Sequence, residues 1–70
     1  MIEFRSKHEE QLYTAAYTKK YQSTYEASFK RLISRGLPDD EARYIANENA
    51  EFRATDAAYE VLGEYRRVGE

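Results

Sequence analysis

The chain contains no cysteine and no tryptophan, and its 70 residues include only one proline, three glycines and one histidine. Without cysteine it can form neither disulfides nor thiolate metal sites, and nothing points to secretion. No apolar run approaches the roughly 18 residues that a membrane-spanning helix needs, and the first residues do not resemble a signal peptide. These absences favour a cytoplasmic protein.

The sequence also lacks the residue combinations on which most enzymes depend. His8 has no Glu-x-x-His spacing around it, which argues against a carboxylate–histidine metal site. The serines occupy capping or surface positions, and the glycines are too scattered to form a phosphate-binding loop. The start of a helix explains Asp39, Asp40 and Glu41 better than a metal site does. We therefore expect no catalytic residues, no metal, no cofactor and no small-molecule substrate.

Two rows of residues with a four-residue period dominate what is present. The first consists of large residues and the second mainly of small ones. The rows are Tyr13, Tyr17, Tyr21, Tyr25, Phe29 and Ile33, and then Ala42, Ala46, Ala50, Ala54, Ala58 and Leu62. Such a repeat forms the ridge that one helix packs into the groove of another. The rows therefore predict two helices in close contact, with Tyr21, Tyr25 and Phe29 in the core.

Ser6 and Glu9 mark the start of the first helix. They fit a capping box, in which the Ser6 hydroxyl accepts the Glu9 amide and the Glu9 carboxylate accepts the Ser6 amide. Residues 7 to 35 contain neither proline nor glycine, so one continuous helix is expected. The weak helix formers around Ser23 make a break there the alternative. Ahead of this helix, Ile2 and Phe4 are expected to pack as an N-terminal arm.

The turn between the helices is the clearest boundary in the sequence. Gly36 stands where a left-handed residue ends a helix, and Leu37 follows in the next position of a Schellman motif. Pro38 then opens the second helix. We predict an all-α fold, a single-domain antiparallel helical hairpin over residues 1–70, with helices at about 6–35 and 39–67 and a turn at 36–38. Residues 69–70 are expected to fray.

One partner helix should not be able to cover either row completely. Each member is displaced by about 40° around the helix, so six members sweep about 200°. In the second helix, Ile45, Phe52 and Tyr59 add a separate apolar stripe. We therefore predict a homodimer that forms a four-helix bundle, or docking on a larger protein. The residues expected at this interface are Ile45, Phe52, Tyr59, Tyr13, Tyr17 and Tyr65, with Tyr44 as a further candidate.

Charge is distributed unevenly along the chain. Residues 1–36 contain seven Lys or Arg and four acids, whereas residues 37–70 contain four Arg and nine acids, for a net charge of -2 overall. Attraction between the halves would support the hairpin. The alternative interpretation is an acidic face that binds a basic partner.

These features favour a non-enzymatic protein–protein interaction module, an adaptor or a stoichiometric inhibitor of a larger protein. Accessory proteins of phages and mobile elements are often small, acidic and helical, as this chain is expected to be, although no motif supports that association. A structural subunit of a larger assembly would show the same features. The alternative function is a small homodimeric RNA- or DNA-binding protein. It would use the basic residues of the first helix, Lys19, Lys20, Lys30, Arg31 and Arg35.

Overall fold

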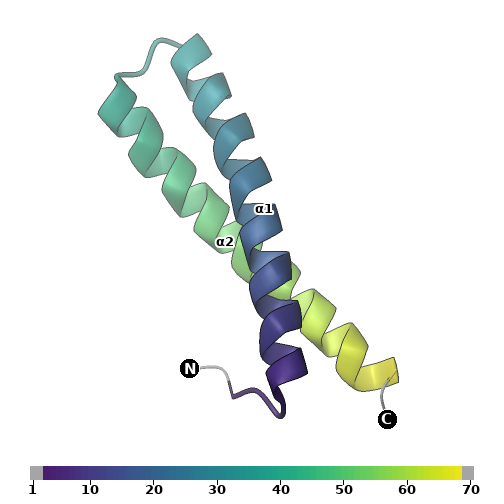
Figure 1. Cartoon of the computed structure of the whole chain (residues 1–70). Helices are drawn as coiled ribbons and strands as arrows, with labels where there is room; N and C mark the ends of the chain where they lie inside the picture. Colours follow the sequence, from purple (N-terminus) through teal and green to yellow (C-terminus); the bar gives the residue numbers. More distant parts are fainter. Residues whose placement is uncertain (1–2, 69–70) are drawn as a thin grey trace.

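The computed structural model describes residues 3–68 as two long helices joined by a short turn (Figure 1). Helix α1 spans Lys7–Ser34 and helix α2 spans Asp39–Val68. The predicted all-α hairpin is confirmed, and the described residues contain no strand. The helix boundaries differ from the predicted ones by at most one residue. The predictions for Ile2 and for residues 69–70 lie outside the described residues.

The start of α1 confirms half of the predicted capping box. The Glu9 amide donates to the Ser6 hydroxyl at 3.2 Å. The Glu9 carboxylate, however, accepts the amide of Arg5 at 2.7 Å, one residue before the predicted donor. It is also bound by Arg66 from α2. The box is therefore wrong in its second half, because this carboxylate serves a contact between the two helices as well as the cap.

Helix α1 is continuous through the stretch in which a break was the alternative. The Ser23 hydroxyl donates to the carbonyl oxygen of Lys20 at 3.2 Å. A serine that bonds to the preceding turn in this way satisfies its hydroxyl inside the helix. Ser23 therefore does not need to begin a new helix.

The turn has the predicted Schellman geometry. Gly36 has a φ of 90°, in the left-handed region that favours glycine. Its amide donates to the Ile33 carbonyl at 2.9 Å, and the Leu37 amide donates to the Leu32 carbonyl at 3.2 Å. These two bonds satisfy carbonyl groups that the end of a helix would otherwise leave without partners.

Pro38 immediately precedes the first residue of α2. The Pro38 carbonyl accepts the Ala42 amide at 2.9 Å. Three acids, Asp39, Asp40 and Glu41, occupy the first turn. Negative charge is favourable there because it lies near the positive end of the helix dipole.

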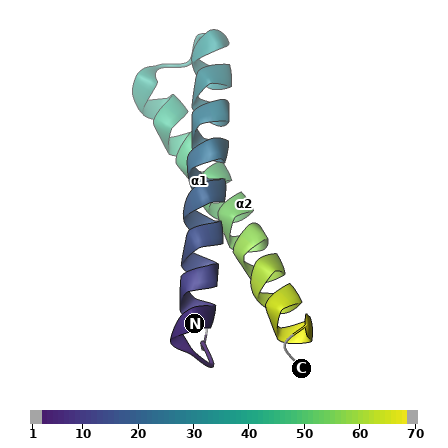
Figure 2. The ribbon, with the colours of Figure 1, turned by 45° about the vertical axis from the view of Figure 1, so that its right-hand side comes forward.

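The small-residue row of α2 is the core of the hairpin. Its five alanines are 0% exposed and Leu62 is 3% exposed. Burial of the whole row within one chain contradicts the prediction that a second partner must cover part of it. That prediction assumed helices running side by side, whereas α1 and α2 cross (Figures 1 and 2). In a crossed pair the line of contact winds around each helix and follows the drift of a period-four row.

On α1, two ridges flank this alanine row. One is the tyrosine row, and the other begins one residue earlier and consists of smaller side chains. The Tyr21 hydroxyl donates to Asn47 on the first side, and Asn49 donates to the Ser28 hydroxyl at 3.2 Å on the second. Every member of the second ridge except Lys20 is buried or half-buried. The second ridge consists of Leu12, Ala16, Lys20, Thr24, Ser28 and Leu32.

Candidate interaction surfaces

The aromatic residues of α1 form a continuous row of rings. Neighbouring ring centroids lie 6.0–6.2 Å apart, and their planes differ by 4–20°. Each ring from Tyr13 to Phe29 is half-buried, while Ile33 at the end of the row is 40% exposed. Tyr13 also meets Phe4 and Tyr59 edge-on, at 5.5 and 5.8 Å. The Phe4 contact agrees with the predicted packing of the N-terminal arm.

Two members of this row, Tyr13 and Tyr17, were predicted to lie at an outer interface, whereas Tyr21, Tyr25 and Phe29 were predicted to lie in the core. Tyr13 and Tyr17 are half-buried and pack against other rings of the same chain. Burial raises the pKa of Tyr13, and its neighbours Tyr59 and Tyr17 raise it further. Burial also raises the pKa of Tyr21, with a smaller effect from the negative charge of Glu51. Both phenol groups therefore favour the neutral form, which is the form compatible with packing between the two helices.

The stripe on α2 lies on the face opposite the alanine row. Ile45 is 41% exposed, Phe52 is 69% exposed and Tyr59 is 50% exposed. At 100° per residue, these three positions point away from the buried alanines. We call this surface, made of Ile45, Phe52 and Tyr59, the outer stripe. Tyr59 is shared with the core through its contact with Tyr13, so Phe52 is the member most free to bind a partner.

Acidic residues border the outer stripe. A surface hollow of about 520 Å³ is lined by Glu48, Glu51, Phe52, Thr55 and Asp56. A second hollow of about 540 Å³ is lined by Asp40, Glu41, Tyr44 and Ile45. Tyr44 is 65% exposed, and its hydrogen bond with Glu48 raises its pKa. The stripe is therefore apolar along its centre and negative on its borders.

Tyr65 lies apart from the outer stripe. Its ring centroid is 5.2 Å from that of His8, with the planes tilted by 60°, and Tyr65 is 39% exposed. At 100° per residue its position falls near the alanine side of α2, not the stripe side. The predicted interface set thus divides into three stripe residues, two residues of the ring row and Tyr65.

Glu9 and Arg66 form the principal electrostatic contact between the helices. The Arg66 Nε and Nη2 atoms donate to the two carboxylate oxygens of Glu9, each at 3.0 Å. These bonds from Arg66, aided by the bond from the Arg5 amide, lower the pKa of Glu9 from 4.5 to about 2, against the opposing effect of burial. The acid comes from the basic half of the chain and the arginine from the acidic half. This pair therefore does not arise from the charge asymmetry that the sequence suggested.

The structure divides the five predicted basic residues. Lys20 and Arg31 line a groove of about 310 Å³ between the helices, and Arg53 of α2 joins them. Lys19 lines a different surface, and Lys30 and Arg35 are exposed outside the groove. The sequence reasoning missed Arg53, because only the packing of α2 against α1 brings it beside Lys20 and Arg31.

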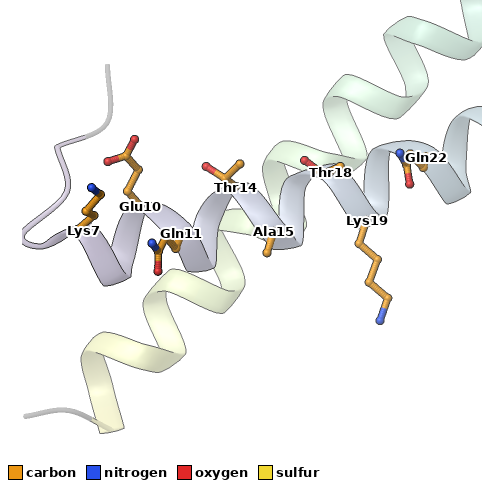
Figure 3. Close-up of a pocket in the computed structure, with 8 residues that line it drawn as sticks. All are labelled: Lys7, Glu10, Gln11, Thr14, Ala15, Thr18, Lys19 and Gln22. Atoms are coloured by element: carbon orange, nitrogen blue, oxygen red, sulfur yellow. The ribbon is translucent and has the colours of Figure 1, made fainter.

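The outer face of α1 carries a wide surface hollow of about 650 Å³. Figure 3 shows that its lining side chains all come from α1 and follow one side of that helix. They are mostly small or uncharged, and they bring no histidine or acid pair together. The residues are Lys7, Glu10, Gln11, Thr14, Ala15, Thr18, Lys19 and Gln22.

Two further observations concern the described residues as a whole. In residues 3–68, no group of three or more His, Cys, Asp or Glu could hold a metal ion. Over the same residues, neither helix combines the length and apolar character that crossing a membrane requires.

Comparisons with protein-family models, with curated proteins and with solved structures find no match for this chain. Its function is therefore inferred from the surfaces described above.

Proposed function

We propose that this chain is a non-enzymatic protein-binding module, an adaptor or stoichiometric inhibitor, that docks through the outer stripe of α2. The observation that carries the proposal is Phe52, a large apolar side chain 69% exposed at the centre of the stripe. Aromatic anchors of this kind contribute most of the binding energy at many protein interfaces. Complete burial of a phenylalanine side chain is worth about 1.5–3 kcal/mol.

The expected partner offers an apolar groove with a basic rim. The three residues of the outer stripe are spaced seven apart along one face of α2, and this spacing suits docking of a helix into a groove. Glu48 and Asp56 lie one turn before and one turn after Phe52 and line its hollow. Lysine or arginine side chains around the groove of the partner would complement these acids and accelerate association.

Two observations favour a different protein over a second copy of this chain at the outer stripe. The alanine row is already buried within one chain, which removes one reason to expect a four-helix dimer. A pairing of two stripes centred on Phe52 would also bring Glu48 and Asp56 close to the same acids of the copy, in either helix orientation. Like charges placed together at an interface cost several kcal/mol.

The experiment is affinity capture from lysate with the wild-type chain and with Phe52→Glu, together with light scattering of the pure proteins. We expect the wild type to recover one protein at fixed stoichiometry and Phe52→Glu to lose it. The milder change Phe52→Ala should weaken binding by about 10- to 100-fold, since about 1.4 kcal/mol corresponds to a factor of ten.

Thr18→Glu is the matched control. It adds the same charge at an exposed position on the outer face of α1 (Figure 3), away from the stripe. We expect this variant to recover the partner as the wild type does. Equal recovery by Phe52→Glu and the wild type would contradict the proposal. A wild-type dimer that Phe52→Glu converts to a monomer would assign the stripe to self-association instead.

A further inference from the structure

The groove between the helices on the Ser28–Asn49 side has a basic border. Lys20 and Arg31 come from α1, Arg53 comes from α2, and no acid contributes to the lining. This groove and the outer stripe share no residue, so the inference below does not depend on the proposed function. The full lining is Lys20, Ser23, Thr24, Ala27, Ser28, Arg31, Asn49 and Arg53.

The three cations are not neutralised by the chain itself. Within residues 3–68, none of the three forms an ion pair. Elsewhere in α2 the arginines do find acids, as Arg43 does with Asp39 at 3.0 Å. Lys20, Arg31 and Arg53 are all exposed. Their charges are therefore available to an anionic ligand.

The spacing of the cations indicates an extended ligand. Lys20 and Arg31 are eleven residues apart, which places them on one side of α1 and about 16 Å from each other along its axis. Asn49 bonds to Ser28. Since the two helices are antiparallel, Arg53, one helical turn after Asn49, lies opposite the part of α1 that is between Lys20 and Arg31. One phosphate ion could not reach all three cations, whereas a chain of phosphates could.

The composition of the groove distinguishes a nucleic acid from an acidic protein segment. Ala27 is the only apolar residue in the lining, and the core of a protein interface needs large apolar anchors. Nucleic-acid interfaces are more polar and more positively charged. The net charge of -2 does not forbid such a ligand, because exposed charges farther apart than about 8 Å are largely screened at physiological ionic strength.

We propose that this groove binds the phosphodiester backbone of a nucleic-acid strand through Lys20, Arg31 and Arg53. The ring row of α1 lies on the other side of the alanine row, so the bases would not stack on it. Recognition would therefore depend on phosphate charge and be largely independent of base sequence.

The test is fluorescence anisotropy with labelled single-stranded DNA and RNA of mixed sequence, titrated with the full chain at several salt concentrations. Three phosphate contacts on a single strand predict a slope of log K against log salt of about -2. Arg53→Ala should weaken binding to both probes and reduce the slope by about 0.7. Circular dichroism should show unchanged helicity, because Arg53 is exposed.

Arg43→Ala is the matched control, since it removes the same side chain from the same helix outside the groove. We expect Arg43→Ala to retain the wild-type affinity and salt slope. Phe52→Ala, which changes the outer stripe, should retain them too. No binding at low salt would overturn the proposal, as would an equal loss of affinity for Arg43→Ala and Arg53→Ala. Competition by polyglutamate as strong as that by unlabelled DNA would instead assign the groove to an acidic protein segment.

Discussion

Arg66 near the end of α2 holds Glu9 near the start of α1 through two hydrogen bonds of 3.0 Å. The same guanidinium donates to the carbonyl oxygen of Glu3 at 3.0 Å. Since the helices are antiparallel, this contact lies at the end of the hairpin opposite the turn. The turn connects the helices at one end, and the Glu9–Arg66 pair joins them at the other.

The first prediction concerns acid stability. The folded chain lowers the pKa of Glu9 from 4.5 to about 2, so the folded state favours the charged carboxylate. The stability contributed by this group is complete above pH 4.5, decreases as the pH falls, and is lost below about pH 2. We expect Glu9→Gln to remove this part of the acid dependence. Thermal unfolding followed by circular dichroism between pH 2 and pH 7 measures it.

Arg66→Met and Arg67→Met separate the ion pair from a general effect of charge. Arg67 is exposed in the same last turn of α2 and serves as the control. Arg66→Met leaves Glu9, whose side chain is only 3% exposed, without its guanidinium partner, and should lower the midpoint of unfolding at pH 7. If Arg67→Met lowered it as much, Arg66 would act only through the helix dipole.

Much of the fold could be predicted because its signals are local. The Ser6 cap depends on residues close together in the chain, and the Schellman turn depends on Gly36 having a positive φ. The period of four in each row also identified the buried side of α2. What the sequence could not provide was the crossing of the helices, because that depends on how two ridges of α1 fit around the alanine row.

The candidate surfaces depend on that crossing, so local signals in the sequence define them less closely. The outer stripe was identified because a face opposite the alanine row is exposed whatever the crossing. The angular drift of the tyrosine row predicts that Tyr13 and Tyr17 lie at an outer interface, whereas in the structure both are half-buried and pack against rings of the same chain. Arg53 joins Lys20 only when α2 crosses α1 beside Ser28. No spacing within one helix encodes that juxtaposition.

The second prediction concerns the hydrogen bond that joins the ring row of α1 to α2. The Tyr21 hydroxyl donates to the side-chain oxygen of Asn47, so Tyr21→Phe removes a bond between the helices while retaining the ring. We expect a loss of about 1 kcal/mol in the free energy of unfolding, measured with urea. Tyr17→Phe is the control, because Tyr17 is half-buried in the same row and its hydroxyl has no partner in residues 3–68. Equal losses for both variants would show that Asn47 contributes nothing.

The third prediction concerns two glycines that should respond oppositely to alanine. A Cβ atom at Gly63 would meet nothing within 4 Å, and this glycine lies inside α2, so Gly63→Ala should stabilise the chain by about 1 kcal/mol. Gly36 also has free space, but its φ of 90° is one that alanine rarely adopts. Gly36→Ala should therefore cost about 1–2 kcal/mol. For a domain of this size, 1 kcal/mol shifts the thermal midpoint by about 4–8 °C, which differential scanning calorimetry resolves. A stabilised Gly36→Ala variant would mean that the turn does not need its left-handed residue.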